Sequence, residues 1–153
     1  MFLTNDFDDP LEGFDSHVYI PCLRTDDLVF HLAKPEVQQR LERAAGISVS
    51  AVASLRTAIG HLFQHFTRRN ARACAISLPP DFSPTRISDG RAETAIDAVL
   101  TRGLAANESD RRAAANFVFW TLAEFCDEYS LPFDLMIGVN RGVYADGVHH
   151  VAE

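Results

Sequence analysis

Leu131-Pro-Phe-Asp-Leu-Met-Ile-Gly-Val-Asn-Arg141 is the stretch of this chain that decides the fold. A segment with helical periodicity, from Ser109 to about Tyr129, leads into Pro132, and a short apolar run then ends in the polar pair Asn140-Arg141. Helix, turn, buried strand and polar strand end together form one unit of a parallel α/β protein. In such proteins ligands bind beyond the carboxyl ends of the strands.

The same unit recurs along the chain. Strands are predicted over residues 2–6, 18–24, 72–78 and 134–139, as continuous apolar runs typical of strands buried on both faces. The helices predicted between them are 36–45, opened by Pro35 and ended by Gly46; about 50–70, capped by Ser48 or Ser50; 91–102, ended by Gly103; and 109–129, capped by Ser109.

Strands separated by long helical segments indicate right-handed crossovers and a parallel sheet. We therefore expect one α/β domain over residues 1–153, with about four parallel strands and intervening helices, as a partial (β/α)8 TIM-type barrel. An open doubly wound sheet is the alternative. No glycine-rich phosphate-binding motif follows any strand, which removes the common nucleotide-binding reason for an open sheet.

Composition narrows the class of protein further. The chain has 153 residues, of which 47% are hydrophobic, and a formal net charge of -7. This acidity argues against nucleic acid as the partner, and no apolar run approaches the roughly 20 residues of a membrane helix. We expect no membrane partner and a cytoplasmic location. Cys22, Cys74 and Cys126 lie far apart without a C-x-x-C pair, which predicts buried free thiols.

Polar residues at the predicted strand ends are the candidate ligand-binding side chains. Asp6 and Asp9 follow the first strand, Arg24 and Asp26 the second, and Arg141 the fourth. An arginine fork donates two parallel hydrogen bonds, which suits a carboxylate or phosphate. The alternative is that Arg24 pairs with Asp26 or Asp9 as a structural clamp, and the residue types leave the two interpretations about equal.

His61 and His65 have the i, i+4 spacing of metal ligands on a helix. The intervening residues lack the glutamate of an H-E-x-x-H motif, and the pair lies in the middle of a helix. We therefore expect structural or solvated histidines and no metal site.

Several of these segments resemble one family. Thr4-Asn-Asp-Phe-Asp-Asp-Pro10 is similar to a T-T-D-D-P motif, Ile20-Pro-Cys-Leu-Arg-Thr-Asp26 to P-x-x-R-P-D, and Leu135-Met-Ile-Gly-Val-Asn-Arg141 to L-H-I-G-A-L-R. The helix and strand around residues 63–78 resemble those that lead to D-H-G-L. These motifs, in this order, belong to uronate (glucuronate) isomerases of the amidohydrolase superfamily, which are distorted (β/α)8 barrels of carbohydrate metabolism.

The resemblance implies aldose–ketose isomerisation of hexuronates, of the glucuronate-to-fructuronate type, with a small sugar acid as the partner. By position, Arg24 matches the arginine that binds the substrate carboxylate, and Arg141 the arginine after the fourth strand. Asp6, Asp9 and Asp26 match acidic positions. The family's divalent, zinc-type metal is implied to bind an H-x-H motif and an aspartate on the first and last barrel strands. Neither strand is among these residues, so no metal ligand is assigned here.

Two departures weaken the match to an active enzyme. Met136 stands where the family has a histidine, and Ser77-Leu-Pro-Pro80 replaces D-H-G-L. We expect a central fragment of a divergent member, inactive alone, whose full-length form isomerises uronates. The alternatives are a divergent superfamily enzyme with another reaction, or a non-catalytic sugar-acid-binding homologue. Open sheet edges would also favour self-association as a homo-oligomer.

Overall fold

The computed structural model describes residues 1–13, 15 and 18–137. Its elements follow in the order β1 (Phe2–Asp6), β2 (Ile20–Arg24), α1 (Asp26–Phe30), α2 (Pro35–Ala45), α3 (Val52–Arg68), β3 (Ala73–Leu78), α4 (Asp89–Arg102), the short 3-10 helix η1 (Gly103–Ala105), α5 (Glu108–Glu128) and β4 (Phe133–Ile137). All four predicted strands are present. The last two residues predicted for the fourth strand lie outside the described residues.

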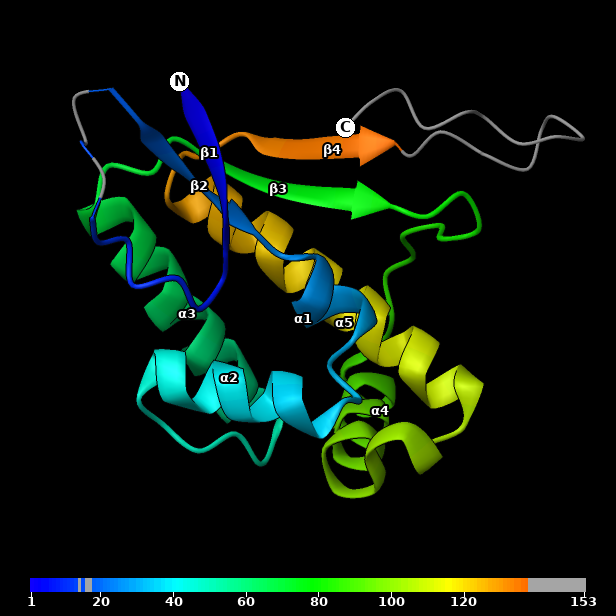
Figure 1. Cartoon of the computed structure of the whole chain (residues 1–153). Helices are drawn as coiled ribbons and strands as arrows, with labels where there is room; N and C mark the ends of the chain where they lie inside the picture. Colours follow the sequence, from blue (N-terminus) through cyan, green and yellow to red (C-terminus); the bar gives the residue numbers. More distant parts are fainter. Residues whose placement is uncertain (14, 16–17, 138–153) are drawn as a thin grey trace, which may run out of the picture.

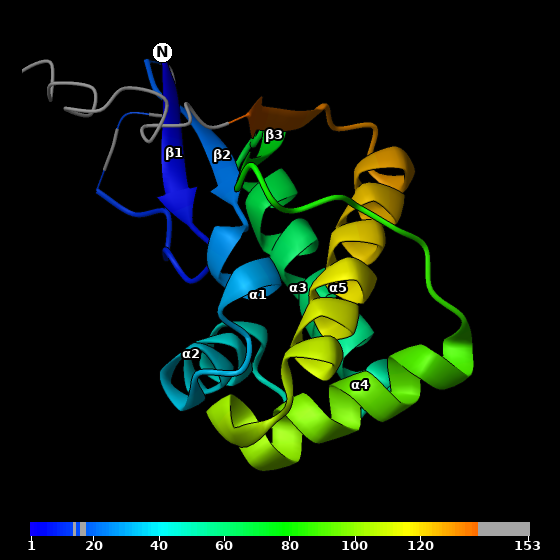
Figure 2. The ribbon, with the colours of Figure 1, turned by 90° about the vertical axis from the view of Figure 1, so that its right-hand side faces the viewer.

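The strands form one parallel sheet in the order β1-β2-β3-β4, which is also their order along the chain. Among the described residues, the helices lie on one side of this sheet (Figures 1 and 2). A doubly wound sheet would carry helices on both faces, whereas a barrel keeps all of them outside. The prediction of an α/β partial barrel is confirmed, and the open face of the sheet corresponds to the interior of such a barrel.

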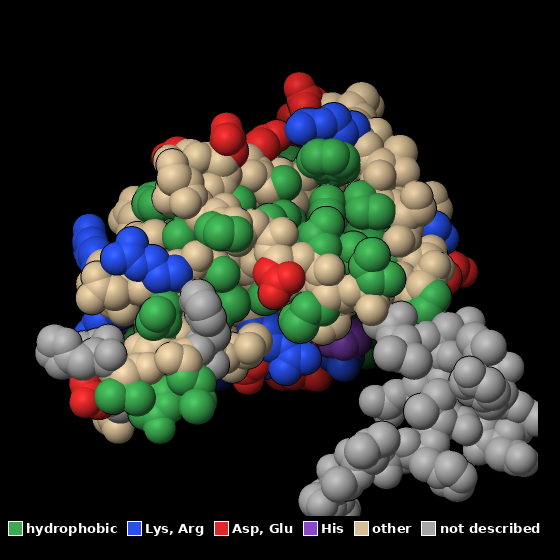
Figure 3. Space-filling view, turned by 90° about the horizontal axis from the view of Figure 1, so that it is seen from above, with side chains coloured by type: hydrophobic (Ala, Val, Ile, Leu, Met, Phe, Trp, Pro, Cys, Tyr) green, Lys and Arg blue, Asp and Glu red, His purple; other side chains and the backbone are tan. Residues whose placement is uncertain are grey.

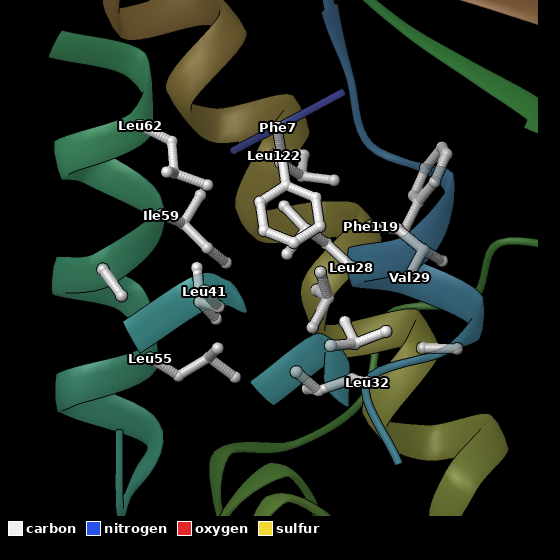
Figure 4. Close-up of a cluster of buried hydrophobic side chains, with 14 of the residues drawn as sticks. Phe7, Leu28, Val29, Leu32, Leu41, Leu55, Ile59, Leu62, Phe119 and Leu122 are labelled. Carbon is white, nitrogen blue, oxygen red and sulfur yellow. The ribbon is translucent and has the colours of Figure 1, made fainter. Parts of the chain in front are cut away.

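The core lies between the sheet and the helices. Apolar residues at helical spacing, Leu55, Ile59 and Leu62, form the buried stripe of α3 and face Leu122 of α5 (Figure 4). Phe7, which follows β1 directly, is 1% exposed and closes the same cluster from the loop side. The core therefore holds the carboxyl end of β1 in place against the helices. This packing also positions the polar residues at the same end of the sheet.

Several helix boundaries differ from the sequence predictions. The short helix α1 was not anticipated, because five residues after a strand give no helical periodicity. Ser48 and Ser50 are not the cap of α3, which begins after Ala51; instead Ser54 accepts a hydrogen bond of 3.0 Å from the Ala51 amide. Ser109 is likewise wrong as a cap, because Asn107 accepts the Asp110 amide at 2.8 Å. Pro35, Gly46 and Gly103 mark helix ends as predicted.

The three cysteines are free and buried, as expected. Burial, with a smaller contribution from the charge of Asp134, raises the pKa of the Cys22 thiol to about 11. Burial also raises the pKa of the Cys74 thiol. Both thiols are therefore protonated at neutral pH and are poor nucleophiles. In the part of the chain that the structure describes, no helix is both long enough and apolar enough to cross a membrane.

The turn after α4 depends on a glycine. Gly103 has φ +55°, and a Cβ there would meet the Ala33 carbonyl oxygen at 3.0 Å. We expect Gly103→Ala to lower the free energy of unfolding by about 1–3 kcal/mol, through backbone strain and this contact. Gly90→Ala, in open space at the start of α4, is the matched control and should change it by less than about 1 kcal/mol. Urea denaturation measures both, and equal effects would contradict the role of the turn.

Candidate functional site at the carboxyl ends of β1 and β2

The candidate site lies where the first two strands end. Asp6 and Arg24 are the last residues of β1 and β2 and are register partners in the parallel ladder. They line a hollow of about 250 Å³ together with Phe7, Asp26 and Asp27. The structure therefore brings together three of the five predicted binding residues, Asp6, Arg24 and Asp26, by the geometry that the sequence suggested.

Arg24 is bound by one carboxylate, that of Asp26. Its Nε donates a hydrogen bond of 3.2 Å to Asp26 Oδ2, and the arginine side chain is 46% exposed. This hydrogen bond, with the charge of the same carboxylate, raises the pKa of Arg24. Among the described residues, the two terminal nitrogens of Arg24 form no hydrogen bond or ion pair. The clamp that the sequence allowed is thus present, and it leaves the fork of the guanidinium free for a second carboxylate.

Asp26 connects this arginine to the neighbouring strand. Its other oxygen, Oδ1, accepts a hydrogen bond of 3.2 Å from the amide of Ser77 in β3. The next residue back along the chain, Thr25, is fully buried, and its hydroxyl donates to the Ala75 carbonyl at 3.1 Å. Asp26 therefore has both oxygens occupied, so it positions Arg24 and has little capacity left to bind a ligand directly.

A second arginine that the sequence analysis missed neutralises the rest of the cluster. Arg40 of α2 forms a bidentate contact with Asp8, through Nε at 2.8 Å and a terminal nitrogen at 2.5 Å. Its remaining terminal nitrogen donates to Asp27 at 2.8 Å, and Asp6 lies 3.7 Å away. The hydrogen bonds from Arg40 lower the pKa of Asp8. No local pattern around Arg40 points to this role, because its partners are 13 to 34 residues away in the sequence.

Asp9, the fourth predicted binding residue, is placed differently. Asp9 does not line the hollow: its carboxylate accepts hydrogen bonds from the Asn5 side-chain amide at 2.9 Å and the Leu11 amide at 2.7 Å. It therefore shapes the loop after β1. Arg141 lies outside the described residues.

The two helical histidines are structural, as predicted. His61 Nδ1 lies 2.8 Å from the Ala45 carbonyl, and His65 Nε2 lies 3.1 Å from the Asp9 carbonyl. Within the described ranges, no group of three or more His, Cys, Asp or Glu side chains is arranged to hold a metal ion. The aspartates at the strand ends instead form hydrogen bonds or ion pairs with arginines and amides. The described residues therefore do not fit the divalent metal of the resembling family.

Two solved structures have folds similar to this chain. Uronate isomerase from Thermotoga maritima superposes with a TM-score of 0.78 at 17% sequence identity, over 90% of this chain and 32% of the isomerase chain. Glucuronate isomerase from Caulobacter crescentus superposes with a TM-score of 0.74 at 16% sequence identity. The match covers 95% of this chain and 32% of the glucuronate isomerase chain. This chain thus spans about a third of the length of these structures, as expected of a fragment of such a barrel.

No protein-family model matches the sequence, and no curated protein matches it significantly. The structural similarity therefore establishes the class of fold, a partial barrel of the type found in uronate isomerases. It agrees with the family that the strand motifs resemble.

Proposed function

We propose that this chain is part of a uronate isomerase-like barrel and binds the carboxylate of a hexuronate through Arg24. The observation that carries the proposal is the guanidinium of Arg24 at the end of β2. Asp26 binds its Nε, and the guanidinium lines a hollow at the end of the sheet where parallel α/β proteins bind ligands. The similarity of the fold to two uronate isomerases supports the choice of a sugar acid over other carboxylates.

The charges around Arg24 limit how tightly an anion binds. Asp6, which is 64% exposed on its side chain, and Asp27 lie beside the same hollow and raise the pKa of Arg24 further. Arg40 offsets these carboxylates, because it contacts Asp6, Asp8 and Asp27. We infer weak, salt-sensitive binding that depends on a bidentate contact with Arg24 rather than on a positive field.

The isomerisation itself is proposed for a complete barrel. Aldose–ketose interconversion of a uronate moves a proton between C1 and C2 of the open-chain sugar, so a group that can take up and return that proton is required. The carboxylates that line the described hollow are engaged by arginine. Met136 on β4 lies outside this hollow, and its thioether cannot exchange a proton. This chain therefore supplies substrate binding, and the proton-transferring groups belong to the remainder of the barrel.

A non-catalytic sugar-acid-binding protein is the second candidate function. It is favoured by Met136 and by Ser77-Leu-Pro-Pro80, which stand where the resembling family carries histidine and aspartate. Both candidate functions include binding of the sugar carboxylate by Arg24. Only the isomerase converts the bound uronate into product. Nuclear magnetic resonance of glucuronate with and without a divalent metal, followed for the appearance of fructuronate, separates them for the complete protein.

The test of binding is a titration of the 153-residue chain with glucuronate, followed by amide chemical shifts. We expect Arg24→Ala to weaken binding about 10-fold or more, because a hydrogen bond to a charged group contributes roughly 1.5–3 kcal/mol. Arg102→Ala, at the exposed end of α4, removes the same charge far from the site and should leave binding unchanged. Equal affinities of the Arg24 variant and the wild type would refute the proposed contact.

A further inference from the structure

The charged groups that control access to Arg24 lie at the ends of the strands. Seen from above, hydrophobic side chains gather across the helix-free face of the sheet, and most of the charged side chains in view lie toward its margin (Figure 3). The hollow that contains Arg24 is lined by three carboxylates, those of Asp6, Asp26 and Asp27. Because an approaching anion competes with these carboxylates for the guanidinium, what holds each of them decides whether Arg24 stays available.

Asp6 is the register partner of Arg24, yet the two side chains do not pair. Neighbouring strands lie about 4.8 Å apart, so the backbones of these two residues are close, and their opposite charges attract each other. Among the described residues, the ion pair that Asp6 forms is with Arg40, at 3.7 Å, and the one that Arg24 forms is with Asp26. The terminal nitrogens of Arg24 are therefore free while Asp6 is engaged by Arg40.

Arg40 is fixed in place and does not line the hollow itself. Its guanidinium carbon lies 4.7 Å from the centre of the ring of Phe7, which is buried. Its Nε and one terminal nitrogen contact Asp8, and the other terminal nitrogen donates a hydrogen bond of 2.8 Å to Asp27. All three guanidinium nitrogens thus have acidic partners, and Arg40 is not among the residues that surround the hollow. Arg40 therefore acts on Arg24 through the carboxylates that it holds.

Removal of Arg40 would release Asp6 toward Arg24. The Asp6 side chain is 64% exposed, so it is able to reorient, and its register partner then offers it two unoccupied guanidinium nitrogens. Because Asp6 belongs to the same chain, its effective concentration beside Arg24 is of the order of millimolar or higher, and it competes with a dissolved acid. An exposed ion pair shifts an equilibrium by up to about 5-fold, which sets the size of the expected effect.

We propose that Arg40 is a positioning residue that keeps the guanidinium of Arg24 open to a ligand carboxylate by holding Asp6 away from it. This role rests on the proposed function, because it concerns the carboxylate contact of Arg24. Every contact that carries it lies within residues 6–40, in β1, β2, α1, α2 and the segment that follows β1. Arg40 thereby adds α2 to the elements that build the site.

The test is a titration of the 153-residue chain with glucuronate at low ionic strength, followed by amide chemical shifts, with circular dichroism to establish that each variant is folded. Arg40→Gln should weaken binding about 3–5-fold, because the released Asp6 competes for Arg24. Adding Asp6→Asn to this variant removes the competitor and should restore the wild-type affinity to within about 2-fold. Adding Asp8→Asn instead gives the same net charge, but Asp8 does not line the hollow, so binding should stay weak.

The Nε–H resonance of Arg24 without ligand is the second readout. Pairing with Asp6 should shift it in Arg40→Gln, and Asp6→Asn should return it, whereas a general loosening of α2 would not be reversed by Asp6→Asn. Unchanged affinity in Arg40→Gln, no recovery with Asp6→Asn, or equal recovery with Asp8→Asn overturns the role of Arg40. If Arg24→Ala still weakens binding in that case, the proposed carboxylate contact is retained. If Arg24→Ala leaves binding unchanged, the proposed function fails as well.

Discussion

Phe63→Ala is expected to lower the free energy of unfolding by about 3–5 kcal/mol. Phe63 is fully buried in α3. Its ring stacks on Phe125 of α5 at 5.4 Å between centroids and lies 5.7 Å from that of Tyr129. The substitution removes an aromatic ring from the contact between two helices, and close-packed neighbours cannot fill the space that it leaves.

The measurement is urea denaturation followed by circular dichroism. Phe63→Leu keeps most of the apolar volume and should cost clearly less than the alanine variant. Leu104→Ala, at an exposed position on η1, controls for the loss of an apolar side chain without a cavity and should change stability by no more than about 0.5 kcal/mol. A loss below about 1 kcal/mol for Phe63→Ala would show that α3 and α5 do not pack as described.

The elements that were predictable from sequence are those with a long or repeated local signal. The buried stripe of α3 and the continuous apolar runs of β2 and β3 led directly to the parallel sheet. Pro35 and Gly46 were reliable ends of α2, because one fixes φ and the other adopts a left-handed conformation with φ 70°. Each of these signals lies within the segment that it describes.

What was missed depends on contacts between segments. Several serines and an asparagine near the starts of α3 and α5 could each have served as a cap, and only the backbone path selects among them. Asp9 follows a strand end, as a binding residue would, yet the loop turns its carboxylate toward Asn5 and the Leu11 amide. The strand-end rule thus predicted which strand ends gather polar residues, but it could not tell which carboxylates line the hollow there.

Arg40 is the clearest example of such a long-range contact, and its removal is the second large effect that we expect. Arg40→Gln should lower the free energy of unfolding by about 1–3 kcal/mol at pH 7, because hydrogen bonds to charged groups contribute about that much. The bidentate contact with Asp8, whose side chain is 29% exposed, accounts for most of it, and the contact with Asp27 for the rest. Asp6 adds little, because its side chain is 64% exposed and solvent screens the interaction.

This effect should depend on pH in a definite direction. The pKa of Asp8 in the folded protein lies below its ordinary value of 3.8, chiefly because Arg40 donates hydrogen bonds to the charged form. A lowered pKa gives stability that is fully present above the unfolded value and is lost as the pH falls through the folded one. The stability difference between wild type and Arg40→Gln should therefore be constant from pH 7 to about pH 5 and shrink below about pH 4.

Arg43→Gln provides the matched control within the same helix. Arg43 is exposed, and among residues 1–13, 15 and 18–137 its Nε donates only to the Gln39 carbonyl, at 3.2 Å. Because Arg43 forms no ion pair with a carboxylate in the described part of the chain, we expect a change within about 0.5 kcal/mol and almost no dependence on pH. If both variants lose the same stability, or if the Arg40 variant is equally destabilised at pH 3 and pH 7, the carboxylate cluster beside the candidate site is not what holds α2 against the end of β1.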